Sequence, residues 1–70
     1  TGEDDVYGGI GNDELYGDQD QDTVRGAQGN DTLYGGTGND LLQGGQNDDW
    51  LYGGDDEDTL DGGSGNDQIY

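Results

Sequence analysis

An aspartate recurs at every ninth residue of this 70-residue chain, with no break in register. These residues are Asp4, Asp13, Asp22, Asp31, Asp40, Asp49, Asp58 and Asp67. An aliphatic residue follows two positions after each one, in the order Val6, Leu15, Val24, Leu33, Leu42, Leu51, Leu60 and Ile69. A glycine opens every complete unit, which divides the chain into a partial repeat (1–7) and the nonapeptides 8–16, 17–25, 26–34, 35–43, 44–52, 53–61 and 62–70. The whole chain is therefore one repeat array, with aspartate at position six and the aliphatic residue at position eight.

A nine-residue period is too short for a helical repeat, and leaves room for one tight turn and one short strand. Glycine at positions one, two and four predicts backbone angles with φ > 0 in the turn. Where position four is not glycine it is Asp20, Asn47 or Asp56, residue types that tolerate this region well. The next three residues alternate outward, inward and outward, as in a strand. Because such a short strand is unstable alone, we expect the strands to stack in a parallel solenoid.

The composition is that of a disordered polyanion. The formal net charge is -17, from 18 acidic residues and one arginine, and only 24% of the residues are hydrophobic. A chain with this combination does not fold unaided. A multivalent cation that binds only the folded form would cancel the repulsion and connect the turns. The lack of a basic patch argues against a nucleic-acid partner.

Missing residue types narrow the functional classes further. The absence of cysteine is compatible with an extracellular protein without deciding the compartment, and no apolar run approaches membrane-spanning length. With no histidine, cysteine or lysine and with Ser64 as its one serine, the chain offers no nucleophile paired with a base, so we expect no enzymatic activity. The chain has no targeting segment and starts within a repeat, from which we expect a segment of a longer protein.

Three units carry the repeat in its most regular form: GGIGNDELY (8–16), GGTGNDLLQ (35–43) and GGSGNDQIY (62–70). They resemble the calcium-binding nonapeptide of the repeats-in-toxin (RTX) family, and the resemblance extends over the whole chain. It implies an all-β fold, a parallel β-roll or β-solenoid with two nonapeptides in each 18-residue coil and two short-stranded parallel sheets. It also implies Ca²⁺ ions between turns that are 18 residues apart at either edge of the roll.

The resemblance also implies which atoms bind calcium. The side-chain ligands would be Asp13, Asp31, Asp49 and Asp67 on one edge, and Asp4, Asp22, Asp40 and Asp58 on the other. The backbone ligands would be turn carbonyls around Gly8, Gly9, Gly11, Gly26, Gly29, Gly35, Gly36, Gly38, Gly44, Gly45, Gly53, Gly54, Gly62, Gly63 and Gly65. Carboxylate and carbonyl oxygens suit Ca²⁺, which prefers six to eight oxygen ligands. Each row of four aspartates has three intervals, so about six Ca²⁺ ions would bind and, with twelve positive charges, leave -5 of the formal -17.

Two turns, residues 17–22 and 53–58, depart from the regular pattern by carrying extra acidic residues. Both lie on the second edge, where we expect altered coordination or weaker affinity. The extra carboxylates are either additional ligands or a solvated acidic rim. Extra negative charge can strengthen calcium binding even from outside the coordination shell.

Two other binding functions fit the sequence poorly. Residues 18–22 resemble the start of an EF-hand loop, but Thr23 occupies the place of the required glycine and Gly29 that of the final glutamate. An ice-binding surface would need a regular threonine ladder. The residues at position three are Ile10, Gln19, Gln28, Thr37, Gln46, Asp55 and Ser64, which form no such ladder.

An aromatic row follows from the 18-residue coil. Tyr16, Tyr34, Tyr52 and Tyr70 occupy position nine in alternate units, and Trp50 is expected at an outward position of the same sheet. One interpretation is that the stacked rings stabilise neighbouring strands. The other is that they form an interaction stripe for lateral self-association or for a carbohydrate, because an exposed aromatic stripe is unusual on an isolated monomer.

Two hypotheses for function remain open. In the first, the chain is a calcium-binding structural segment of a secreted or cell-surface bacterial protein, such as an adhesin, a surface layer or a filament, with repeats joined end to end. In the second, it is the calcium-triggered folding and secretion module of an RTX toxin, protease or lipase. Both hypotheses predict an extracellular location and folding on calcium binding.

Overall fold

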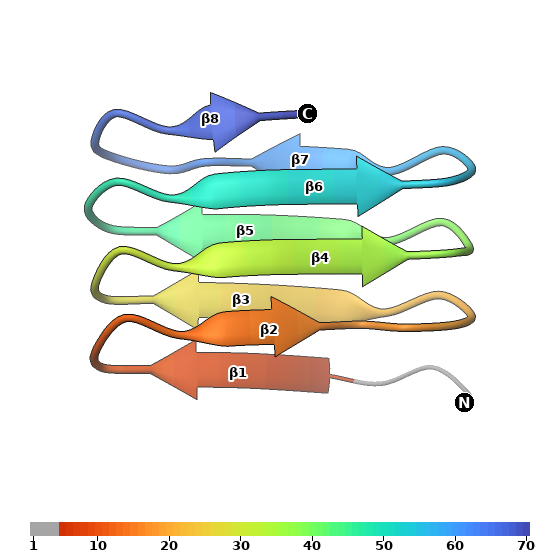
Figure 1. The fold of residues 1–70 in the computed structure, drawn as a ribbon, viewed down its shortest axis with the longest axis horizontal. Helices are drawn as coiled ribbons and strands as arrows, with labels where there is room; N and C mark the ends of the chain where they lie inside the picture. Colours follow the sequence, from red (N-terminus) through yellow and green to blue (C-terminus); the bar gives the residue numbers. More distant parts are fainter. Residues whose placement is uncertain (1–4) are drawn as a thin grey trace.

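The computed structural model describes residues 5–70, which wind into a flattened coil of short strands (Figure 1). The strands are β1 (Asp5–Gly9), β2 (Glu14–Tyr16), β3 (Thr23–Ala27), β4 (Thr32–Gly36), β5 (Leu41–Gly45), β6 (Trp50–Gly54), β7 (Thr59–Asp61) and β8 (Gln68–Ile69). Consecutive strands alternate between two sheets, ordered β1-β3-β5-β7 and β2-β4-β6-β8. Within residues 5–70, no helix has the length and apolar character needed to cross a membrane.

Every strand pair is parallel and has a register of 18 residues. Val24 in β3 pairs with Val6 on one side and Leu42 on the other, and Leu33 in β4 pairs with Leu15 and Leu51 in the same way. Two nonapeptides therefore complete one coil. The expected all-β parallel solenoid with two short-stranded parallel sheets is confirmed, and each sheet has four strands.

Several strands are longer than the three residues expected. Strands β1, β3, β4, β5 and β6 each contain five residues, because pairing continues into positions one and two of the next repeat. Gly9 pairs with Ala27, and Gly36 pairs with Gly54. The backbone amide of Gln28 also donates to the carbonyl of Gly9 over 3.0 Å. After these five strands, the start of the turn is thus still part of the parallel ladder.

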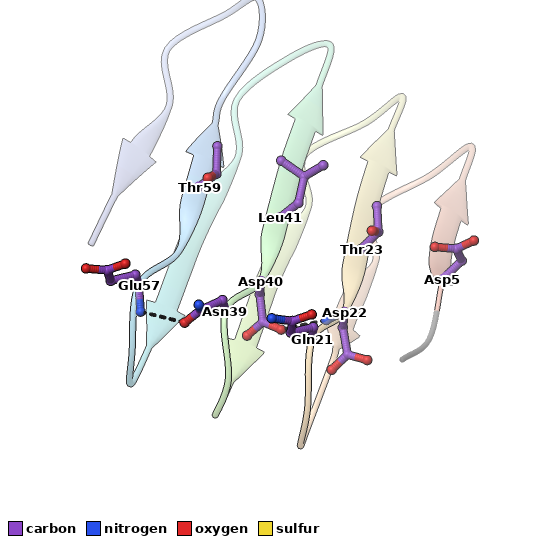
Figure 2. A pocket seen from close by; sticks show the side chains of 9 residues that line it. All are labelled: Asp5, Gln21, Asp22, Thr23, Asn39, Asp40, Leu41, Glu57 and Thr59. Carbon is purple, nitrogen blue, oxygen red and sulfur yellow. Dashed lines mark hydrogen bonds between the residues drawn. The ribbon is translucent and has the colours of Figure 1, made fainter. Parts of the chain in front are cut away.

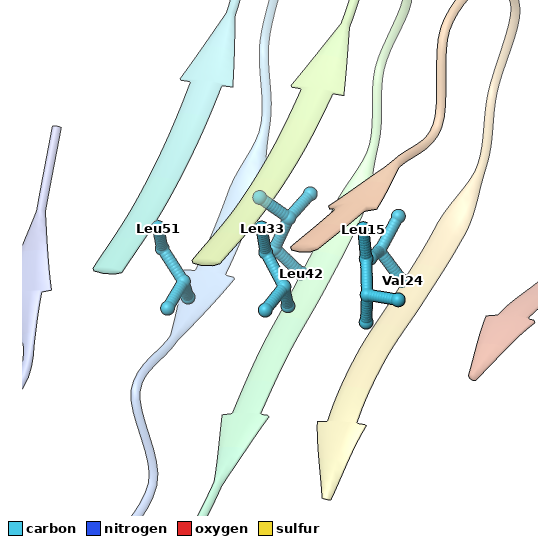
Figure 3. Close-up of a cluster of buried hydrophobic side chains, with 5 residues drawn as sticks. All are labelled: Leu15, Val24, Leu33, Leu42 and Leu51. Atoms are coloured by element: carbon cyan, nitrogen blue, oxygen red, sulfur yellow. The ribbon is translucent and has the colours of Figure 1, made fainter. Parts of the chain in front are cut away.

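The core is a single file of aliphatic side chains that enter alternately from the two sheets (Figure 3). Leu15, Val24, Leu33, Leu42 and Leu51 are buried, and Val6 and Leu60 pack partly against them. Ile69 is 51% exposed, since β8 is the outermost strand of its sheet. Because this core is so narrow, the edges, where the aspartates lie, must contribute much of the stability that holds successive coils together.

Candidate calcium-binding edges

The predicted aspartates form two rows, one along each edge of the solenoid, just before the strands begin. The first edge carries Asp13, Asp31, Asp49 and Asp67, and the second carries Asp22, Asp40 and Asp58. Asp4, the remaining predicted ligand, lies outside the described residues. Asp22, Asp31, Asp40 and Asp49 are buried although they are acidic. A buried carboxylate requires hydrogen bonds or a cation to offset the loss of water.

In both rows, the Oδ1 oxygen of an aspartate accepts a hydrogen bond from the neighbouring coil. Oδ1 of Asp31 accepts a hydrogen bond of 2.8 Å from the backbone amide of Asp13, and Oδ1 of Asp49 accepts one of 2.8 Å from the amide of Asp31. On the second edge, Oδ1 of Asp40 accepts an equivalent bond from the amide of Asp22 (Figure 2). Oδ1 of Asp58 accepts one from the amide of Asp40 in the same way. These bonds fix the orientation of the carboxylate and therefore the direction of its second oxygen.

The second oxygen is buried without a hydrogen bond. Oδ2 of Asp13, Asp31, Asp40 and Asp49 has no such partner among the described residues. A buried acceptor left unpaired in this way costs free energy, and more when it is charged. Because this unpaired oxygen recurs in successive coils, we interpret it as a position where each carboxylate oxygen contacts a cation.

The glycine at position one lies opposite this oxygen. A Cβ atom built on Gly26 would lie 2.5 Å from Oδ2 of Asp31 and 2.8 Å from the carbonyl oxygen of Gly44 in the next coil. On Gly35, the corresponding distances are 2.7 Å to Oδ2 of Asp40 and 2.6 Å to the carbonyl of Gly53. A carboxylate oxygen and a carbonyl oxygen from adjacent coils thus face one space that only glycine leaves open.

This arrangement corrects one prediction from the sequence. Positive φ was expected at positions one, two and four, but it occurs only at positions two and four. The position-one glycines, Gly8, Gly17, Gly26, Gly35, Gly44, Gly53 and Gly62, all lie outside the left-handed region. They are required for space rather than for backbone angle, since a Cβ would strike the carboxylate and, in most coils, the next carbonyl.

Aspartates alone do not complete a metal site. Within residues 5–70, no group of three or more acidic side chains comes close enough to hold an ion. Carbonyl oxygens must supply the remaining ligands. Those at position one face the aspartate, whereas those at position two accept hydrogen bonds from the next coil, as in the bond of 2.8 Å from the amide of Gln46 to the carbonyl of Ala27. A carbonyl has a second lone pair that remains available.

Without a cation, the ionised form of the buried carboxylates is electrostatically unfavourable. The pKa of Asp49 is raised to about 6, chiefly by burial; the hydrogen bond from the Asp31 amide acts to lower this pKa, and the nearby charges of Asp31, Asp67 and Asp48 add to the rise. Burial likewise raises the pKa of Asp31 and of Asp40. A divalent ion beside these oxygens would supply the missing positive charge.

The irregular turns of the second edge keep the backbone shape of the regular ones. Asp18, Asp20 and Asp56 adopt φ of 76°, 77° and 72°, in the region that glycine occupies elsewhere. Their side chains are exposed, as are those of Asp55 and Glu57. Oδ2 of Asp56 accepts a hydrogen bond of 2.9 Å from the amide of Gly38. The extra carboxylates therefore lie on the solvent side of the edge, as an acidic rim would.

A second ladder, at position five, was not predicted. Oδ1 of Asn12 accepts from the amide of Asn30 over 2.8 Å, and Oδ1 of Asn30 accepts from the amide of Asp48 over 3.0 Å. On the second edge, Oδ1 of Asn39 accepts from the amide of Glu57 (Figure 2). In this ladder the amide of the later coil donates to the side chain of the earlier coil, whereas in the aspartate rows the amide of the earlier coil donates to the later side chain. The sequence signal was the recurrence of a side-chain carbonyl or carboxylate at position five of every repeat.

The four predicted tyrosines form a continuous stack on the outer face of the β2-β4-β6-β8 sheet. Ring centroids are 4.7 Å apart between Tyr16 and Tyr34, 5.1 Å between Tyr34 and Tyr52, and 5.0 Å between Tyr52 and Tyr70. The interplanar angles are 5° to 9°. Trp50 lies beside this stack and contacts Tyr52 and Tyr70. The structure brings together all five residues of the predicted stripe.

Comparison with protein families matches residues 1–33 and 34–69 to the RTX calcium-binding nonapeptide repeat. The chain belongs to the RTX repeat family. Comparison with curated proteins and with solved structures gave no match. RTX repeats bind Ca²⁺ and are typical of secreted bacterial proteins. The stacked aspartates, the carbonyls opposite them and the absence of softer ligands fit this hard cation.

Proposed function

We propose that this RTX segment is a calcium-dependent structural module of a secreted or cell-surface bacterial protein. Ca²⁺ bound between successive turns would hold its coils together. Repeats of the same kind would stack end to end and lengthen the solenoid. The segment would act by binding and shape, without catalysis. About six ions are proposed, one for each interval between stacked aspartates.

The observation that carries the proposal is the buried Oδ2 oxygen of Asp31, together with the carbonyl of Gly44 that faces the same space. The hydrogen bond from Asp13 already satisfies Oδ1, so the fold holds the carboxylate in place but leaves its second oxygen uncompensated. With a formal charge of -17 on 70 residues, this cost is repeated along both edges. Calcium binding would therefore contribute directly to the free energy of folding.

The same dependence supports a second role, as the folding and secretion module of a larger toxin, protease or lipase. A chain that stays unfolded at the low calcium of the cytosol can be exported unfolded and then fold outside. The two roles differ in what the intact protein looks like. Electron microscopy of the native parent protein with and without chelator distinguishes them, since a long calcium-dependent rod supports a structural role and a compact particle supports an attached folding module.

Calcium-dependent folding is tested on the chain itself. Circular dichroism should change from disorder in chelator to β-structure in millimolar Ca²⁺, and native mass spectrometry should count the bound ions. Tb³⁺ provides a local probe, because Trp50 directly follows Asp49 and can sensitise the luminescence of an ion at that site. Equal β-content with and without calcium would overturn the proposal. Tb³⁺ luminescence that does not fall when excess Ca²⁺ is added would also overturn it.

A further inference from the structure

The outer face of the β2-β4-β6-β8 sheet differs in chemistry from the rest of the molecule. We call it the aromatic face, and its outward residues are Glu14, Tyr16, Thr32, Tyr34, Trp50, Tyr52, Gln68 and Tyr70. Glu14 is the only charged residue among them, in a chain with 18 acidic residues. The opposite sheet presents Asp5, Arg25 and Asp61 at equivalent positions. The aromatic face is therefore suited to an uncharged ligand.

Trp50 is the aromatic ring of this face that is not part of the stack. The tyrosine rings lie nearly parallel and cover one another's faces. The Trp50 ring is instead tilted by 51° from Tyr52 and by 49° from Tyr70, at centroid distances of 6.4 and 6.5 Å. The residue is 46% exposed. An indole held by two neighbours and open to solvent offers a preformed apolar platform.

A polar hollow of about 370 Å³ adjoins this platform, lined by Asn30, Asp31, Thr32, Asp48 and Trp50. The Oδ1 atoms of Asn30 and Asp48 are occupied by the position-five ladder, with bonds from the amides of Asp48 and Asn66. The side-chain nitrogen Nδ2 of Asn30 and the Oδ2 atom of Asp48 make no hydrogen bond within residues 5–70. The ladder thus fixes a free donor and a free acceptor, one coil apart, beside an exposed indole.

We infer that the aromatic face binds a neutral glycan, with one sugar ring lying on Trp50. One sugar hydroxyl would accept a hydrogen bond from the side-chain amide of Asn30, and an adjacent hydroxyl would donate one to the Asp48 carboxylate. The glycan would continue along β4 and β6, past Thr32, to the hydroxyl groups of Tyr34 and Tyr52. Ligand sites of this kind combine an apolar surface with a few fixed polar groups.

Other occupants fit the face less well. A second copy would need roughly 800 Å² of contact from each partner for a stable dimer. That contact would bury about a fifth of the 4042 Å² accessible surface of the molecule, and each copy carries net negative charge, formally -17 without calcium and -5 with six Ca²⁺ ions bound. An anionic ligand would find no cation, since Arg25 lies on the opposite sheet and donates to Gln43.

The test uses the calcium-loaded chain, whose single tryptophan makes fluorescence specific for the site. Cellotetraose, maltotetraose and N-acetylated chitotetraose serve as neutral probes. At least one of them should produce a saturable change in Trp50 fluorescence. Calorimetry should then show binding about tenfold or more weaker in Trp50→Thr, the loss expected for removal of an anchoring indole. Threonine is the residue that the same row already carries at position 32.

Tyr7→Thr is the matched control, because Tyr7 is an exposed aromatic residue of the opposite sheet. It should leave binding unchanged, and circular dichroism should show the calcium-loaded fold in both variants. Three results would overturn the inference: no saturable response to any of the three sugars, equal affinity in Trp50→Thr, or sedimentation that shows a dimer lost in Trp50→Thr. The last result would assign the face to a second copy of the chain.

Discussion

The carboxylate of Asp31 bridges two coils through its Oδ1 atom, which accepts a hydrogen bond of 2.8 Å from the amide of Asp13, while its Oδ2 atom is buried without a hydrogen-bond partner among the described residues. The amide of Asp31 in turn donates to Oδ1 of Asp49. Each inner aspartate therefore takes part in two intervals of its row. An outer aspartate such as Asp67 contributes to one described interval.

Substitution of Asp31 by asparagine should impair the calcium response more than the same change at Asp67. The asparagine side chain would still accept the hydrogen bond from the amide of Asp13, but two intervals would lose a negative charge. We expect the calcium concentration at half-maximal folding to rise about tenfold, equivalent to about 1.4 kcal/mol, and to rise less in Asp67→Asn. Circular dichroism during calcium titration measures both midpoints. Equal shifts would contradict the model of shared sites.

Gly26→Ala should be strongly destabilising because its Cβ would lie 2.5 Å from Oδ2 of Asp31 and 2.8 Å from the carbonyl of Gly44. Relief of that overlap would separate adjacent coils or displace the carboxylate. Overpacking of this kind costs about 1–3 kcal/mol. Urea denaturation in saturating calcium provides the measurement.

Gly9→Ala is the control for this substitution. A Cβ on Gly9 meets nothing within 4 Å, so the only penalty comes from φ of 87°. We expect it to cost about 1 kcal/mol. If Gly9→Ala proves as damaging as Gly26→Ala, position one is not limited by space.

The rows of aspartates, aliphatic residues and tyrosines were predictable from the sequence because a fixed period acts on every repeat alike. Two repeats complete a coil, so residues 18 apart must stack, as Asp31 does on Asp13 and Tyr34 does on Tyr16. The role of Gly26 was not predictable in this way. It depends on a carbonyl from a different coil, and sequence alone does not separate a need for space from a need for positive φ.

The polar hollow beside Trp50 also could not be predicted from the sequence. The aromatic row indicated a face, but the hollow arises from the direction in which Asn30 and Asp48 turn, and the position-five ladder sets that direction. Asn30 and Trp50 are 20 residues apart and on different coils. Only the combination of the coil with the ladder places them at one site.

Ala27 is the one described residue in the left-handed region that is neither glycine, asparagine nor aspartate, with φ of 78°. Gly45, its counterpart one coil later, has φ of 95°. Ala27→Gly should therefore stabilise the calcium-loaded form by roughly 0.5 kcal/mol, the relief of backbone strain less the greater freedom of the unfolded chain. Urea denaturation detects the change. Ala27→Ser keeps a Cβ atom and should give no gain, and a loss of stability in Ala27→Gly would show that the methyl group contributes favourable contacts.

Acid should partly replace calcium. Burial raises the pKa of Asp49 from 3.8 to about 6, so folding without calcium takes up protons, and stability in chelator should increase as the pH falls through about 6 towards 4. Circular dichroism in chelator should show more β-structure at about pH 5 than at about pH 7. Asp49→Asn, which mimics the neutral form, should weaken this dependence, whereas Asp55→Asn, which removes an exposed charge, should largely preserve it. In calcium the sign reverses, because protons compete with Ca²⁺ for the same oxygens and the calcium midpoint should rise on acidification. A fall in β-structure on acidification in chelator would contradict the buried, uncompensated carboxylates on which the calcium sites depend.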